Sequence, residues 1–255
     1  MLSLSIPVTN VLNWPNVLFQ GTPFAINKVA IISMIASAAA IVLFVSASKK
    51  KNLVPTGVQN LVEASIEFVS ENIVREGMGS DGAAWIPGLT ALFFFIFFSN
   101  LSEVIPFLQM PATARMSTPL PLAIGVWIVF NIVGIKSHGF VNYFKSIAIP
   151  PDVPFALKFL LGPLELISTE LVRPFALAVR LFGNMLAGHL LLTVFTVFCE
   201  VLFVKSFIIL LLPLPFILLV GISGFEIFIA GLQAFIFTVL TAMYIGEAKR
   251  SAHQL

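Results

Sequence analysis

The chain has 255 residues, of which 58% are hydrophobic and only 10% are charged, and its formal net charge is +2. A soluble domain carries about a quarter charged residues, so this composition excludes a soluble globular protein and predicts a protein whose solvent is lipid. So few charges cannot form a basic face, which argues against a nucleic-acid partner. The single cysteine, Cys199, excludes an intrachain disulfide and a thiolate metal cluster.

Residues 1–27 lack the basic region that begins a signal peptide, so we expect them to form an uncleaved segment on the outer side of the membrane. Residues 28–255 are expected to form one polytopic membrane domain. Five apolar stretches in it are long enough to cross a bilayer, which takes about 20 residues. These predicted spans cover residues 29–48, 82–106, 116–135, 163–204 and 206–247.

The last two stretches are each about 40 residues long, which allows two interpretations. As two spans apiece they would bring the total to seven crossings, whereas as single helices rising about 1.5 Å per residue each would be about 60 Å long. Placing Lys49–Lys51 inside puts the C-terminus inside in both cases. Seven crossings would leave irregular backbone facing lipid near Arg173, Arg180 or Glu226. We therefore expect an all-α membrane protein with five crossings, the last two by long, strongly tilted helices.

Residues 57–76 have a different pattern. Apolar residues such as Val58 and Leu61 recur at helical spacing, while Glu63 and Glu67 occupy another face. This pattern predicts an amphipathic helix on the inner membrane surface, which also serves as the linker between two spans.

Ionisable side chains inside spans are candidate functional residues, because each costs roughly several kcal/mol in lipid. Arg180, His189 and Glu226 lie deep in long apolar stretches, where a side chain cannot easily reach an interface. Other charged residues lie at span ends and are interpreted as snorkelling side chains or members of structural ion pairs: Lys28, Glu103, Lys136 and Glu247.

Helical geometry arranges the candidate residues on two faces. At 100° per residue, Arg180 and Asn184 share one stripe, whereas His189 points to the opposite face about 13 Å further along. Glu226 and Gln233 are seven residues apart on one face of the last helix, where Glu226 could meet His189. Arginine stays protonated, whereas His and Glu exchange protons near neutral pH, so the set predicts gated proton passage.

The sequence gives no sign of nucleotide chemistry. It has no Walker glycine loop, no metal-ligand spacing and no pair of nucleophile and base, so we expect no cofactor, no metal and no catalytic site.

The segment Arg180–His189, Arg-Leu-Phe-Gly-Asn-Met-Leu-Ala-Gly-His, resembles the signature of subunit a of the F-type ATP synthases. Arg173-Pro174 precedes it, and a segment that begins Gly-Leu-Gln at Gly231 follows it downstream. The likeness is close over about the last 90 residues, and the span order of the remainder agrees.

The resemblance implies roles for individual positions. Arg180 matches the essential arginine that faces the carboxylate of the rotating c-ring and prevents a proton short circuit. Asn184 matches its polar neighbour, and Gln233 matches the glutamine that meets it from the last helix. His189 and Glu226 match the pair that lines the outer half-channel, although some bacterial relatives carry these two residue types in the reverse order.

For the inner half-channel, two candidates remain open. Glu165 resembles an acidic residue of that path, but its spacing to Arg173 is one residue longer than in many relatives, and Glu170 is a competing candidate.

The resemblance further implies a proton-translocating stator subunit that forms two offset half-channels against the c-ring and couples proton flow to ATP synthesis. Its implied partners are the c-ring, the peripheral-stalk subunit b, the other membrane-sector and F1 subunits, and the lipid bilayer. The stretch Val172–Arg180 looks bacterial, so we expect the bacterial plasma membrane, with the mitochondrial inner membrane as the alternative. Protons are expected rather than sodium ions, because no additional polar cluster for a dehydrated sodium ion is evident.

Two other classes of protein make different predictions. A self-contained secondary transporter predicts inverted-repeat symmetry, and the sequence shows no repeat. A structural anchoring subunit predicts that Arg180 can be replaced without loss of proton flux.

Overall fold

The computed structural model describes residues 16–18, 26–49, 55–105, 108, 110–148, 155–204 and 212–250. Most of the predicted outer segment 1–27 lies outside these residues. A short antiparallel pair, β1 (Asn16–Leu18) and β2 (Ile26–Asn27), precedes the helices. The α-helices are α2 (Lys28–Ser48), α3 (Val58–Val69), α4 (Arg75–Met78), α5 (Ile86–Leu101), α6 (Pro119–His138), α7 (Phe140–Ala148), α8 (Phe155–Ile167), α9 (Arg173–Val204) and α10 (Pro213–Arg250).

Five helical segments are long and apolar enough to cross a membrane: Lys28–Ser48, Asp81–Leu101, Pro119–His138, Leu160–Phe203 and Pro213–Arg250. The predicted fold class, an all-α membrane protein with about five crossings, is confirmed. The second segment ends at Leu101 rather than at residue 106, because the chain turns at residues 102–104. The fifth begins at Pro213, and residues 205–211 lie outside the described part.

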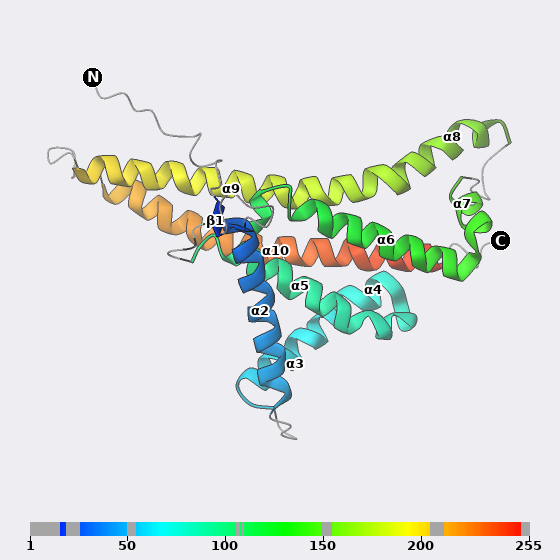
Figure 1. Ribbon diagram of the computed structural model, residues 1–255, viewed down its shortest axis with the longest axis horizontal. Coiled ribbons are helices and arrows are strands. Elements are labelled where there is room, and N and C mark those ends of the chain that lie inside the picture. Colours follow the sequence, from blue (N-terminus) through cyan, green and yellow to red (C-terminus); the bar gives the residue numbers. More distant parts are fainter. Residues whose placement is uncertain are drawn as a thin grey trace.

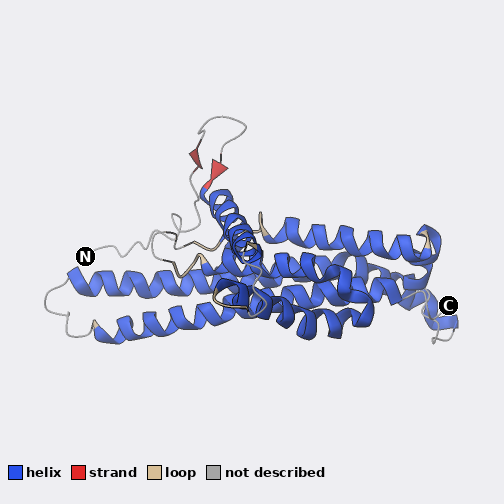
Figure 2. Ribbon diagram, turned by 90° about the horizontal axis from the view of Figure 1, so that it is seen from below, coloured by secondary structure: helices blue, strands red, loops and turns tan. Residues whose placement is uncertain are grey.

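The long helices α9 and α10 run side by side and antiparallel along the longest dimension of the molecule (Figures 1 and 2). Helices α5 and α6 lie beside α10, whereas α2 crosses this bundle instead of running along it (Figure 1). If α2 is close to the membrane normal, α9 and α10 are strongly tilted, and this tilt allows helices of 32 and 38 residues to fit in a bilayer.

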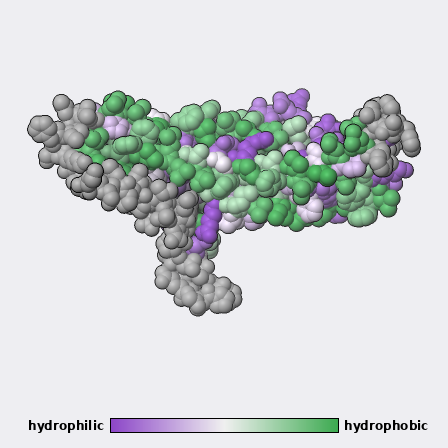
Figure 3. Space-filling model, turned by 90° about the horizontal axis from the view of Figure 1, so that it is seen from above, coloured by the Kyte–Doolittle hydropathy of each residue, from purple (hydrophilic) through white to green (hydrophobic). Residues whose placement is uncertain are grey.

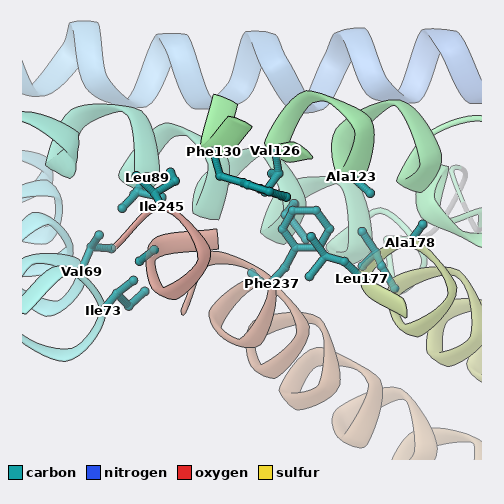
Figure 4. Packing of buried hydrophobic residues seen from close by; sticks show 14 of the residues in the cluster. Val69, Ile73, Leu89, Ala123, Val126, Phe130, Leu177, Ala178, Phe237 and Ile245 are labelled. Atoms are coloured by element: carbon teal, nitrogen blue, oxygen red, sulfur yellow. The ribbon is translucent and has the colours of Figure 1, made fainter. Parts of the chain in front are cut away.

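The core is formed where α10 meets α5, α6 and α9 (Figure 4). Phe237 of α10 is only 2% exposed, and it shares this cluster with Phe130 and Leu177. Lipid is as apolar as these side chains, so close van der Waals packing, rather than hydrophobic transfer, holds such helices together. Gly77 illustrates this, because a Cβ there would meet the Ala242 side chain at 2.9 Å.

The predicted amphipathic helix consists of α3, a π-helical turn at Ser70–Val74, and α4. Its polar face is exposed, as at Glu67 and Arg75. On the other face, Val69 and Ile73 are fully buried in the core cluster that α5 and α10 share. This helix therefore packs on protein as well as facing the surroundings.

The outside of the molecule is largely apolar. One face seen in space-filling form is dominated by hydrophobic residues, with hydrophilic residues in small patches (Figure 3). Large apolar side chains such as Ile41, Phe175 and Phe228 are more than half exposed. Such a surface is stable in contact with lipid or with other subunits rather than with water.

Candidate functional site

Arg180 lies within α9 on a face that the rest of the chain leaves exposed. Asn184 is exposed one turn further along, and the apolar side chains of Phe175 and Val179 are exposed on the N-terminal side. Among the described residues, no carboxylate forms an ion pair with the Arg180 guanidinium. A permanent cation on an apolar surface is costly in lipid, so a partner with a negative charge would stabilise this face, and the described residues supply none.

His189 lies on the side of α9 opposite Arg180, as the helical spacing predicts. Glu226 belongs to the neighbouring helix α10. The two side chains belong to nearly buried residues, with His189 7% exposed and Glu226 5% exposed. The Glu226 carboxylate sits directly against the backbone of Gly188, where a Cβ would overlap both carboxylate oxygens. Glycine at this position therefore allows the acid of α10 to reach the residue next to His189.

Glu103 is the site residue that the sequence interpretation missed. It follows the end of α5 and is only 4% exposed, so it does not snorkel to an interface. Its Oε1 atom lies 3.8 Å from Nδ1 of His189. Burial, with a smaller contribution from the Glu226 carboxylate, raises the pKa of Glu103 to about 8. The available signal was the run of polar residues Ser99, Asn100 and Ser102 just before it, all of which are buried.

This group of three side chains, Glu103, His189 and Glu226, is hereafter called the outer cluster. Glu103 Oε1 and Glu226 Oε2 are buried, and neither has a hydrogen-bond donor among the described residues. A cavity of about 250 Å³ adjoins Glu103 and His189, and Thr193 and Ser223 contribute hydroxyl groups to its wall. This volume is large enough for several water molecules, which would supply the missing donors.

Gln233 lies two turns beyond Glu226 on α10 and is only 2% exposed. Within the described residues, no hydrogen bond joins its amide to the guanidinium of Arg180. The structure therefore places Gln233 inside the bundle and leaves Arg180 on the surface.

The two inner-side candidates differ in their surroundings. Glu165 is half-buried in α8. Glu170 lies in a π-helical turn, Ser168–Val172, that joins α8 to α9. Its Oε2 atom accepts hydrogen bonds from Trp127 Nε1 at 2.9 Å and from Asn131 Nδ2 at 3.0 Å, both on α6. Glu170 is thus tied to a neighbouring helix.

The sequence interpretation predicts that this end of the α9–α10 pair lies on the inner side of the membrane, and it is hereafter called the inner end. Other charged groups at this end form direct pairs. Arg173 donates to Glu247 and lies over the ring of Tyr244, with 5.2 Å from its guanidinium carbon to the ring centroid. Lys249 pairs with Asp81 at 2.8 Å. The interpretation of Glu247 as a member of a structural ion pair agrees with this arrangement.

Within the described part of the chain, no group of three or more His, Cys, Asp or Glu residues is placed to hold a metal ion. The site itself brings together carboxylate and imidazole groups, which are able to exchange protons, and one fixed cation.

Comparison with known proteins adds independent information. A family model described as ATP synthase A chain matches residues 29–246. A protein of Frankia alni named ATP synthase subunit a is 41% identical over 92% of this chain and 82% of its own length. A protein of Rhodococcus erythropolis with the same name is 41% identical over 91% and 85% of the two chains. A fungal protein with this name, from Mycosarcoma maydis, is 33% identical over 97% and 92%.

The family match spans most of the residues in the five apolar segments and includes the exposed arginine and the outer cluster. The chain belongs to the ATP synthase subunit a family, the proton-translocating membrane-sector component of the complex that synthesises ATP.

Proposed function

We propose that this chain is the stator of the proton path, forming two offset half-channels against a rotating c-ring and coupling proton flow to ATP synthesis. One observation supports this most strongly. Arg180 is exposed and has no carboxylate partner among the described residues, whereas His189, on the other side of α9, and Glu226, on α10, are both buried. The fixed cation and the proton-exchanging groups are therefore separated by the thickness of α9.

The exposed face of α9 is the surface that meets the ring. An arginine there is stabilised if a carboxylate of the ring stands opposite it, because the two opposite charges compensate each other where water is scarce. A ring carboxyl group that has taken up a proton is neutral and can rotate through lipid, whereas the carboxylate cannot without a large desolvation cost. Ring rotation is thus tied to protonation.

The outer cluster supplies the entry path. A proton from the outer side reaches the cavity beside Glu103 and His189, then Glu226, and is delivered past α9 to a ring carboxylate. Asn184 and Gln233 are the uncharged polar groups near this transfer. After almost a full turn, the ring carboxyl group loses its proton to the inner half-channel, where Glu165 and Glu170 are the candidate acceptors. Arg180 then stabilises the carboxylate and blocks direct passage between the two half-channels.

Partners and location follow from this role. The c-ring, the peripheral-stalk subunit b and the F1 subunits would be its partners in the complex. Relatives from Frankia and Rhodococcus support a bacterial plasma membrane, and the fungal relative keeps the mitochondrial inner membrane as the alternative.

The test is ATP-driven proton pumping by inverted membrane vesicles that carry the complex with Arg180→Ala. The expected result is loss of pumping although the complex assembles and hydrolyses ATP. Arg75→Ala is the matched control, because Arg75 is an exposed arginine already paired with Glu71 on the amphipathic helix, and this variant should pump normally. Normal pumping by Arg180→Ala would contradict the proposal and favour a purely anchoring role.

A further inference from the structure

The connection between α8 and α9 contains a π-helical turn at Ser168–Val172. In this turn the amide of Arg173 donates to the carbonyl of Ser168, five residues earlier. Such a turn accommodates one extra residue without adding a helical turn, and π turns occur often at functional sites. The extra residue falls between Glu165 and Arg173, which are eight residues apart.

The extra residue matters because helix faces depend on spacing. In a regular α-helix, seven residues rotate the chain by about 700°, which is about 20° short of two full turns. Eight residues would rotate it by about 800° and carry Glu165 about 80° away from the face of Arg173. Because the π turn lies between them, the eight residues from Glu165 to Arg173 rotate the chain by almost the same angle as seven residues of regular α-helix. Glu165 and Arg173 therefore lie on the same face. Arg180 is seven residues further on and shares this face as well.

We propose that this π turn is a register device, which keeps Glu165 aligned with Arg173 and Arg180, and that Glu170 is the positioning residue that anchors it. The proposal rests on the proposed function and decides between the two inner-side acids: Glu165 exchanges the proton, and Glu170 holds the turn.

The contacts of Glu170 support an anchoring role. One carboxylate oxygen accepts from both Trp127 Nε1 and Asn131 Nδ2. The same Asn131 nitrogen also donates to the carbonyl of Trp127 at 3.0 Å, so the two donors are held in place on α6. Thr169, beside Glu170 in the turn, is only 7% exposed. The π turn is therefore packed and bonded against α6 rather than free to convert into α-helix.

Pro174 provides a local reason for the wide turn. A proline ring inside a helix clashes with the carbonyl group four residues earlier, which here belongs to Glu170. A π turn opens the backbone at this point and relieves the clash. The proline favours the irregular turn, and the hydrogen bonds of Glu170 fix where it lies.

The first test compares two amide substitutions in the assembled complex, using ATP-driven proton pumping with ATP hydrolysis as the measure of assembly. Glu170→Gln retains an oxygen that accepts from Trp127 and Asn131, so it should pump within about twofold of the wild type. Glu165→Gln removes the exchangeable proton and should reduce pumping by about tenfold or more. Loss of pumping in Glu170→Gln with normal pumping in Glu165→Gln would overturn the proposal, because Glu170 would then carry the proton.

The second test separates register from anchoring. Glu170→Ala keeps the extra residue but removes the anchor, and should reduce pumping by about fivefold. Deletion of residue 170 removes the anchor and the extra residue together, so the α-helix kinks at the proline instead of widening, the alignment is restored and pumping should recover. Deletion of Ala178, which lies between Arg173 and Arg180 in regular helix, should abolish pumping. The register proposal is wrong if the variant that lacks residue 170 pumps protons no faster than the Glu170→Ala variant. Normal pumping by Arg180→Ala would instead overturn the proposed function.

Discussion

The two ends of the α9–α10 pair both carry charged groups, but these groups differ in their burial and in whether they have direct partners. At the inner end, Arg173 pairs with Glu247 and Lys249 pairs with Asp81, in positions where these side chains are partly exposed. In the outer cluster the acids are buried, and oxygens of Glu103 and Glu226 have no hydrogen-bond donor among the described residues.

This difference indicates that the charged groups at the two ends have different roles. A charge that is matched by a direct partner gains nothing by changing its protonation state and acts as a structural tie. A buried carboxylate without a donor is stabilised when it takes up a proton or when water reaches it. The inner pairs therefore fix the end of α10, and the outer cluster is able to pass protons.

The largest expected effect comes from Glu226→Gln, which removes an exchangeable proton from the outer cluster. ATP-driven pumping should fall by about 100-fold, because proton transfer through the remaining groups is far slower. Glu247→Gln, the same substitution at the inner end of the same helix, should retain pumping within about threefold. If Glu226→Gln and Glu247→Gln reduced pumping equally, the proposed difference in role between the two ends would be wrong.

Gly188→Ala should reduce pumping by about tenfold, because the added methyl group would displace the Glu226 carboxylate from its place against Gly188. The matched control is Gly125→Ala on α6, where a Cβ would meet nothing within 4 Å. Gly188→Ala should pump more slowly than Gly125→Ala at equal amounts of assembled complex, and equal rates would contradict this explanation.

Glu103→Gln should have a smaller effect that depends on pH. The pKa of Glu103 is raised to about 8, so the wild-type side chain is protonated near pH 7 and glutamine imitates that neutral form. Pumping should match the wild type below about pH 7 and fall behind by about threefold above about pH 8.5, where the wild-type carboxyl group ionises and can accept a proton. A deficit that is the same at every pH would argue that Glu103 has only a packing role.

The smallest effect is expected from Lys249→Ala at the inner end. The side chains of Lys249 and Asp81 are 43% and 66% exposed, so their pair contributes about 0–1 kcal/mol. The unfolding temperature of the purified complex should change by less than about 4 °C, with normal pumping. A large loss of pumping would show that this pair belongs to the proton path.

The five long apolar helices could be predicted from the sequence, because a membrane requires about 20 apolar residues for each crossing and lipid excludes irregular backbone. The positions of Arg180, His189 and Glu226 on two faces of the α9–α10 pair followed from helical spacing. Charges deep in apolar stretches are rare, which made these three residues easy to identify.

Glu103 and the π turn could not be identified in the same way. Glu103 lies in a turn after α5, and its position beside His189 of α9 depends on how α5 and α9 both pack on α10, which no local pattern encodes. The π turn departs from the α-helical period by one residue, and a pattern of apolar residues does not reveal so small a change. Its Glu170 side chain accepts hydrogen bonds from Trp127 and Asn131 of α6, which are tertiary contacts that a local sequence pattern does not encode.

The most direct test of the central claim is passive proton conduction through vesicles in which F1 stays attached and nucleotide is omitted, so that the ring cannot turn, with Arg180→Ala compared with wild type and with Arg75→Ala. If Arg180 is the barrier between two half-channels, Arg180→Ala vesicles should dissipate an imposed proton gradient across the membrane sector, although the same variant does not pump. Glu226→Gln combined with Arg180→Ala should close this leak again, because the entry path is then interrupted. The result that would contradict this role of Arg180 is that Arg180→Ala vesicles hold the gradient as well as the controls and pump normally once ATP is added.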